Sequence, residues 1–271
     1  DHYGYDVTSS IGVNSGSGVQ TMLSPKATLA WRVAEPLELY ANYGGGFHSN
    51  DARGAAINID PNTLLPADPV DLLVRANGAE LGARYAQGRF NATFVGFWLH
   101  LDSELVFTGD GGTTEPNPAS RRYGFEFAGF WRPTDALTLD LSAAWTDARF
   151  EGVAPGFDRI PGAITNVVGA GATWDFGHGL TTTLRVRHFG AAPLIEDGSV
   201  WSEPTTLFNL GGYWTTGRLR FGLDVYNLFD SQAADISYFY ASRLPGEPPE
   251  GVDDIHIHPV EPRQLRATVR L

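Results

Sequence analysis

The sequence has no cysteine, only one methionine and only one lysine among its 271 residues. Without cysteine, disulfide frameworks, thiolate metal sites and cysteine nucleophiles are all excluded. No run of 18 or more apolar residues occurs, which excludes a membrane-spanning helix. Basic charge is scarce as well: 31 acidic against 19 basic residues give a formal net charge of −12. This balance argues against a nucleic-acid-binding protein, which needs a basic face.

Glycine and aromatic residues are abundant instead, with 32 Gly, 16 Phe, 10 Tyr and 7 Trp. Such a composition, poor in helix formers, is typical of β-structure. Apolar and polar side chains alternate in several stretches: 122–131, 137–146, 180–188, 218–226 and 265–271. A period of two predicts strands whose two faces meet different surroundings. We therefore predict an all-β protein, and alternation of this kind can hide membrane strands from a mean hydropathy of −0.16.

The period predicts about twelve strands of roughly ten residues, the length that a tilted strand needs to cross a bilayer. Their predicted spans are 2–8, 23–33, 37–46, 78–86, 89–101, 121–132, 136–147, 164–176, 180–190, 205–216, 218–228 and 262–271. Short turns alternate with long polar loops, which lie at 9–22, 47–77, 102–120, 148–163, 191–204 and 229–261. A transmembrane antiparallel up-and-down β-barrel of the bacterial outer membrane shows this order, although a small soluble barrel can imitate it. No repeat or linker divides residues 1–271, so we expect one architectural unit.

Four stretches carry a family resemblance. Asp224-Val-Tyr-Asn-Leu-Phe-Asp230, followed after a long loop by residues 261–271, resembles the last hairpin of TonB-dependent outer-membrane receptors. Leu39–Ser49 is similar to the strand end "Y-G-x-G-F-x-S/A" of that family. Residues 79–84 and 121–126 resemble its "E-x-G-x-R" and "R-x-G-x-E" strands. The motifs occur in the family's order and span nearly the whole chain.

The resemblance implies a 22-stranded barrel filled by an N-terminal plug, which takes up a scarce ligand with energy delivered by TonB. The implied ligands are a ferric siderophore, cobalamin, another metal complex or a saccharide. This chain shows no plug and no TonB-contacting box, and it ends in Leu271 where the family usually ends in an aromatic residue. We therefore expect about the last 12 strands of the barrel, an outer-membrane location in contact with lipid, no enzyme activity and no cofactor.

A ligand site is expected above the lumen, where aromatic and polar groups of different loops converge. Stacking plus a few directed hydrogen bonds is how a pocket holds an amphipathic ligand. The candidates are Tyr43, Phe47, His48, Trp201, Tyr238, Tyr240 and Arg243. In the extended segment near the end of the chain, His256 and His258 fall on one side, which suits a transition metal. Two histidines without a third ligand are more typical of an ordinary surface loop, and we favour that interpretation.

Charged residues with the parity of the lumen face form a second candidate set. Its members are Glu80, Arg84, Glu126, Arg185, Arg187, Arg220 and Asp224. They are able to guide a ligand or hold the plug, but any water-facing barrel wall needs such residues. A hydrated lattice of ion pairs is therefore the interpretation that we favour.

A closed twelve-stranded barrel is the alternative, acting as a passive channel or as a lipid hydrolase. For a hydrolase, His100 and His188 have lipid-side parity near the loop ends of their strands, where an esterase would place a base. Ser103 is near His100 in sequence but has the opposite parity. In a closed barrel the strand at 3–7 must pair with the strand at 264–271. In part of a 22-stranded barrel we expect these two strands to stay apart as sheet edges.

Overall fold

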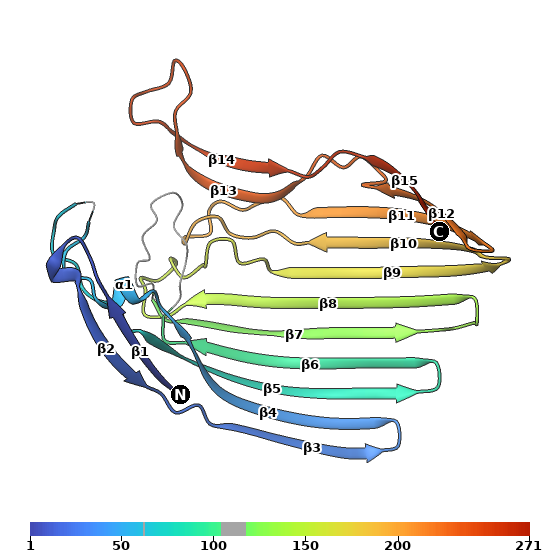
Figure 1. Ribbon diagram of the computed structural model, residues 1–271, viewed down its shortest axis with the longest axis horizontal. Coiled ribbons are helices and arrows are strands. Elements are labelled where there is room, and N and C mark those ends of the chain that lie inside the picture. The colour runs from blue at the N-terminus through green and yellow to red at the C-terminus, as the bar shows by residue number, and fades with distance from the viewer. Residues whose placement is uncertain (62, 104–117) are drawn as a thin grey trace.

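The computed structural model describes residues 1–61, 63–103 and 118–271. This part of the chain folds into an eleven-stranded antiparallel sheet and two separate two-stranded hairpins (Figure 1). One short α-helix, α1 (Ala52–Ala55), and a 3-10 turn at Gly12–Asn14 complete the described elements. No helix in the described ranges is both long and apolar enough to cross a membrane. The all-β, antiparallel architecture is as predicted.

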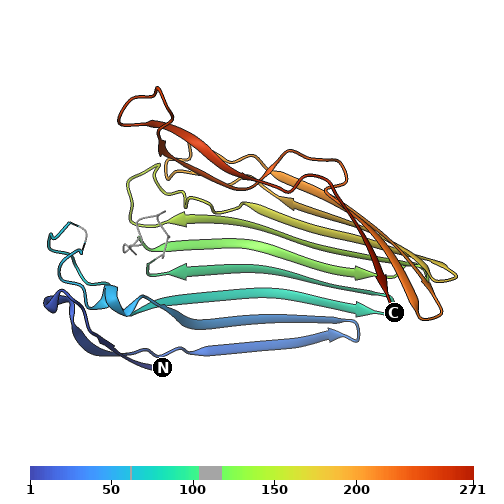
Figure 2. The ribbon, with the colours of Figure 1, turned by 45° about the horizontal axis from the view of Figure 1, so that its top comes forward.

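The large sheet forms a curved wall of long strands, which follow the order of the sequence from β3 to β12 (Figure 1). The strand β15 pairs with β12 and is the last strand on that side. The strands are β3 (Lys26–Ala34), β4 (Leu37–Ser49), β5 (Leu73–Gln87), β6 (Phe90–Leu101), β7 (Ser120–Trp131), β8 (Leu137–Phe150), β9 (Asn166–Gly177), β10 (Leu180–Phe189), β11 (Thr205–Thr216), β12 (Leu219–Tyr226) and β15 (Gln264–Arg270). Short turns lie at one end of the wall and the longer connections at the other (Figure 2). The predicted alternation of short and long connections is confirmed.

The two faces of the wall differ because successive side chains on a strand point to opposite sides. One face, the outer face, carries large apolar side chains that are exposed. They include Leu29, Trp31, Leu81, Phe94, Phe125, Leu141, Trp174, Leu184, Trp214, Leu223, Leu265 and Val269. Near the short turns, Trp174 stacks on Phe176 at 5.6 Å and Trp214 on Phe221 at 5.7 Å. A contiguous apolar surface of this size, with aromatic rings at its border, suits contact with lipid.

Two hairpins lie beyond the wall at the end opposite the short turns (Figures 1 and 2). The N-terminal hairpin pairs β1 (His2–Val7) with β2 (Gly16–Thr21), and the C-terminal hairpin pairs β13 (Ala234–Ser242) with β14 (Val252–Pro259). The strand predicted at 2–8 is present as β1, but its predicted place in the wall is wrong, because it pairs with β2. The prediction of a loop at 9–22 is also wrong, because that stretch contains β2. Pro25, which has no N–H to donate to a ladder, separates β2 from β3. Residues 229–261 were predicted as a loop and instead contain β13 and β14.

The wall ends at β3 on one side and at β15 on the other. Among the described strands no ladder joins these two, and β1 pairs with β2 rather than with β15. The described strands therefore form an open sheet of eleven members rather than a closed twelve-stranded barrel. The prediction that the strand at 3–7 is one edge of the sheet is also wrong, because β3 takes that place.

Candidate functional site

Hydrogen-bonded polar side chains line the second face of the wall, the inner face. Arg84 Nη1 lies 2.9 Å from Glu38 Oε1, and Arg185 Nη1 lies 2.7 Å from both carboxylate oxygens of Asp140. Asn42 donates to Glu80 at 3.1 Å. The ion-paired side chains are a third to a half exposed, so each pair contributes about 0–1 kcal/mol to stability. Their arrangement makes this face hydrophilic.

The register of the ladders places all seven charged candidates on the inner face. They are Glu80, Arg84, Glu126, Arg185, Arg187, Arg220 and Asp224. Asp224 accepts a hydrogen bond from Tyr213 of β11, and the Arg220 guanidinium lies 4.7 Å from the centroid of the same Tyr213 ring. Whether these residues guide a ligand or contact a plug stays a prediction.

The glycines of the two strand motifs are explained by close packing on this face. A Cβ at Gly82 would overlap the ring of Tyr40, which crosses from β4 and is covered by the Arg84 guanidinium at 4.2 Å. A Cβ at Gly124 would overlap the Trp145 carbonyl oxygen and the Phe97 ring. Glycine is needed at both positions because only the missing side chain leaves room for the neighbouring ring.

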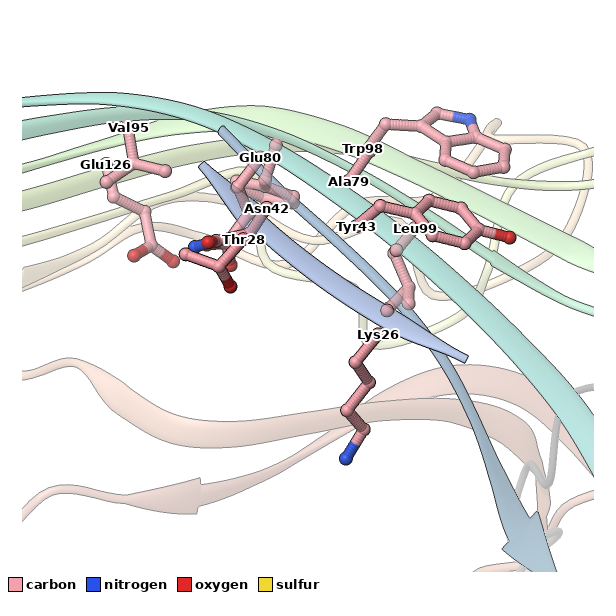
Figure 3. A pocket seen from close by; sticks show the side chains of 13 residues that line it. Lys26, Thr28, Asn42, Tyr43, Ala79, Glu80, Val95, Trp98, Leu99 and Glu126 are labelled. Carbon is pink, nitrogen blue, oxygen red and sulfur yellow. The ribbon is translucent and has the colours of Figure 1, made fainter. Parts of the chain in front are cut away.

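A groove of about 440 Å³ lies over β3–β7 (Figure 3). It lies towards the end of the wall that carries the longer connections, which we call the open end. Lys26, Thr28 and Glu126 point to one side of the strands, whereas Tyr43 and Trp98 point to the other. Tyr43 belongs to the outer face, and its hydroxyl donates to Asn77 at 3.2 Å. The structure therefore does not bring Tyr43 together with the other predicted ligand residues.

Phe47 and His48 lie near the open end of β4. Phe47 packs against the buried core of Met22, Leu72 and Leu73, and its ring meets Tyr3 edge-on at 5.3 Å. These contacts use Phe47 to hold the N-terminal hairpin on the wall. His48 is half-buried, and the register places it on the inner face opposite Val74 of β5.

Trp201 lies in a packed assembly of the loops at 148–163 and 191–204. Its Nε1 donates to the Gly198 carbonyl at 2.7 Å, and the Arg159 guanidinium lies 5.4 Å from the ring. Arg159 N donates to the Glu196 carbonyl at 3.0 Å and so joins the two loops, and Arg149 of β8 holds the first loop through Asp158 at 2.9 Å. Trp201 therefore has a structural role that its sequence context did not indicate.

Tyr238, Tyr240 and Arg243 belong to the C-terminal hairpin. Tyr238 is 59% exposed and Tyr240 is 52% exposed, and Arg243 Nε donates to the Glu247 carbonyl at 3.3 Å. The structure thus groups three of the seven predicted ligand residues on one projecting ribbon. The other four are distributed over β4 and the loop at 191–204.

His256 and His258 have different neighbours on β13. The His256 ring stacks on Tyr240 at 3.9 Å, and its Nε2 lies 3.2 Å from the Tyr240 carbonyl oxygen. His258 Nδ1 lies 2.7 Å from Asp235 Oδ1, and this hydrogen bond lowers the pKa of Asp235 from its ordinary value. In the part of the chain that the structure describes, no group of three or more His, Cys, Asp or Glu residues is placed to hold a metal ion. Metal binding by the two histidines stays a prediction.

The candidates for a hydrolase also have other partners. His100 contacts Glu151 at 3.0 Å and Asp102 at 3.3 Å, and its ring stacks on Trp98 at 6.1 Å. His188 Nδ1 lies 2.8 Å from the Thr206 hydroxyl. Both imidazoles thus contact neighbouring strands and loops at the rim of the wall.

Asn227, which the family motif contains but residue reasoning had not singled out, fastens the base of the C-terminal hairpin. Its backbone is left-handed with φ 47°, and its side chain is 5% exposed. The amide donates to the carbonyls of Ser231 and Glu261, both at 3.1 Å, and accepts from Ser231 N at 2.8 Å. Asp230 adds a bond to Arg263 N at 2.9 Å. The Asn-Leu-Phe-Asp motif therefore holds the base of the C-terminal hairpin in place.

An open, antiparallel wall with one apolar face, one polar face and loop assemblies at a single end defines part of an outer-membrane type of barrel. The family model described as "TonB dependent receptor-like, beta-barrel" matches residues 1–228, and the chain belongs to this family. Proteins of the family are bacterial outer-membrane transporters rather than enzymes. No curated protein matches the chain.

Solved structures of this family share the fold at low identity. The ferric yersiniabactin uptake receptor FyuA from Yersinia pestis is 16% identical, with a TM-score of 0.70 over 94% of this chain and 38% of that one. The ferric-catecholate import receptor Fiu from E. coli K12 is 19% identical, with a TM-score of 0.71 over 93% and 35%. The copper transporter OprC is 18% identical, with a TM-score of 0.70 over 94% and 41%. The chain thus spans about two fifths of their length.

Proposed function

We propose that this chain is part of a receptor of the bacterial outer membrane that takes up a scarce metal complex with energy from TonB. The observation that carries the proposal is the family membership of a wall whose outer face is apolar and whose inner face is polar. The similar receptors named above are described as taking up ferric yersiniabactin, ferric catecholates and copper. A ferric siderophore, cobalamin or another metal complex is therefore the proposed ligand class.

TonB is the proposed partner, acting through a plug domain. The inner face is hydrophilic along most of its strands, which suits contact with a polar plug and with a hydrated ligand. Glu80, Glu126 and Lys26 line the groove over β3–β7. The seven charged candidates are proposed to contact the plug or the ligand.

The C-terminal hairpin is the proposed principal ligand contact. Its aromatic side chains Tyr238 and Tyr240 are more than half exposed, although one face of the Tyr240 ring is stacked on His256. An exposed ring offers a stacking surface, and Arg243 at the tip of the ribbon offers hydrogen-bond donors. His48 and Trp201 lie on other elements near the same end and complete the candidate contacts.

The test is uptake by the intact receptor in matched cells with and without TonB. A panel of ⁵⁵Fe-labelled siderophores and labelled cobalamin is the probe set. At least one complex should accumulate only when TonB is present, and deletion of residues 236–258 should weaken binding while the barrel keeps its heat-modifiable gel mobility. Deleting the turn at 245–250 serves as a control, because it shortens the ribbon and retains Tyr238 and Tyr240. Accumulation that is independent of TonB would contradict the proposal.

A further inference from the structure

Charge is distributed unevenly over the inner face. From β4 to β7 the face carries carboxylates at Glu38, Glu80 and Glu126 together with Arg84 and Arg122. From β10 to β15 it carries one carboxylate, Asp224, and five arginines, which are Arg185, Arg187, Arg220, Arg266 and Arg270. A basic surface is unexpected in a protein with a net charge of −12. Such a surface attracts a negatively charged group.

Two of these arginines, Arg220 of β12 and Arg270 of β15, are direct partners in the ladder. Like charges directly opposite each other on neighbouring strands destabilise a sheet. Within residues 1–61, 63–103 and 118–271 neither of them has a carboxylate at ion-pair distance, whereas Arg185 is paired with Asp140 at 2.7 Å. The opposed pair therefore costs stability unless an anion compensates it.

The surroundings of the pair supply further hydrogen-bond donors. The Arg220 guanidinium carbon lies 4.7 Å from the centroid of the Tyr213 ring, and the guanidinium carries five N–H donors. Thr215 is the partner of Arg220 on β11, and Thr268 is on the same face two residues before Arg270. Cβ atoms of directly opposed residues lie about 4.5–5.5 Å apart, so the two arginine side chains leave the sheet side by side on the inner face.

We propose that Arg220 and Arg270 form an arginine clamp that binds a carboxylate- or phosphate-bearing solute on the inner face. Two guanidinium groups and two hydroxyl groups are a donor set suited to oxyanions. That the clamp binds the transported ligand on its way through the receptor rests on the uptake function proposed above. Its binding can be measured separately from uptake.

Loop carboxylates such as Glu196 and Asp197 do not oppose this binding, because they lie at the other end of the strands. The carboxylate of β12, Asp224, is four residues from Arg220 and accepts a hydrogen bond from Tyr213. Arg220 is six residues from Tyr226, which corresponds to about 20 Å at roughly 3.3 Å per residue. The Debye length is about 8 Å at physiological ionic strength, so the charge of the loops is screened at the clamp. Towards the open end, Arg266 lies over Tyr226 at 5.1 Å and Arg187 over Phe189 at 5.3 Å, and both extend the basic surface.

The experiment is calorimetric titration of the purified, detergent-solubilised intact receptor with pyrophosphate and with citrate at low salt. The wild type should bind at least one of the two probes. Arg220→Gln with Arg270→Gln should weaken that binding by about tenfold or more, since two charge-assisted contacts are lost. Arg220→Lys with Arg270→Lys should fall between, because it keeps the charge and loses the planar fork. Heat-modifiable gel mobility verifies that each variant is folded.

The matched control is Arg89→Gln with Arg132→Gln, which removes the same charge at the turns of the same end. Arg89 is paired with Asp135 at 2.6 Å and lies outside the clamp. The control should bind as the wild type does. Equal affinity of the clamp variant and the control would overturn the proposal. The proposal would also be overturned if the wild type bound neither probe and the clamp variant lost thermal stability. That result would indicate that the two arginines contact an acidic segment of the receptor. TonB-dependent uptake with no probe binding would overturn the clamp and leave the uptake function intact.

Discussion

The two hairpins at the open end are the same kind of element and are held in opposite ways. The N-terminal hairpin is fixed along its length: Asn14 accepts from the backbone of Asn58 and Ile59, and Gln20 accepts from Leu73 N at 2.8 Å. The C-terminal hairpin is bonded to its surroundings at its base, around Asn227, and then projects away from the wall (Figure 1). A ribbon fixed along its length shapes the rim, whereas a ribbon fixed at its base keeps its side chains available to a ligand.

The largest expected effect is at the core that holds the N-terminal hairpin. Leu73 is 2% exposed, so Leu73→Ala should leave a cavity and destabilise this end by roughly 2–5 kcal/mol. Hydrogen exchange of residues 1–22 in the intact receptor should speed up accordingly. Leu244→Ala in the other hairpin is the control, because Leu244 is 64% exposed and should have almost no effect. Equal effects of the two variants would show that the hairpins are not held differently.

Asn227→Ala should release the C-terminal hairpin and leave the N-terminal one unchanged. The variant loses three hydrogen bonds of a buried amide and places alanine at a left-handed φ, for a cost of roughly 2–3 kcal/mol. Exchange of residues 234–259 should rise while exchange of 1–22 stays constant. Asn227→Gly separates the two causes, since glycine tolerates the backbone and lacks the amide. If residues 234–259 stayed protected from hydrogen exchange in both variants, Asn227 would not be the residue that holds the hairpin.

A smaller effect is expected from acid. The hydrogen bond from His258 lowers the folded-state pKa of Asp235, so the stabilisation is present above the unfolded pKa and is lost as pH falls through the folded pKa. The base of the C-terminal hairpin should therefore loosen below about pH 4, near the ordinary pKa of an aspartate. Exchange measured across this range should show the change, and Asp235→Asn should abolish its pH dependence. A variant with an unchanged acid transition would assign the loosening to other carboxylates.

The smallest effect is expected for metal binding by the same hairpin. His256 is stacked on Tyr240 and His258 is bonded to Asp235, so neither imidazole is arranged with the other around an ion. Titration of the intact receptor with Cu²⁺ or Zn²⁺ should give the same affinity for the wild type and for His256→Ala with His258→Ala. Affinity that disappears in the double variant, and that weakens below about pH 6 where imidazole protonates, would instead establish a metal site.

The wall was predictable from sequence because alternation over ten residues fixes both the strand and its faces. The hairpins were not, since β2 is rich in glycine and serine, and the alternation of Ile236, Tyr238 and Tyr240 falls in a polar, proline-containing stretch. Contact candidates were chosen as aromatic residues near loops, and that criterion does not specify a face. Tyr43 on the outer face and Trp201 beneath Arg159 both depend on register and on packing between distant loops.

The C-terminal hairpin is attached at its base, through Asn227 and through the hydrogen bond from Thr205 to the Ala234 carbonyl, and it therefore acts as a lever. Its longer strand has nine residues, which at about 3.3 Å each gives a ribbon of roughly 30 Å. A tilt of about 10° at the base would move the tip by roughly 5 Å, a distance similar to that between the centroids of two packed aromatic rings. Asn227 and Asp230, which lie at the base of the ribbon, therefore determine the position of Tyr238 and Tyr240. Given the ligand contact proposed for this hairpin, we expect ligand preference to change with substitutions at the base of the ribbon as well as at Tyr238 and Tyr240.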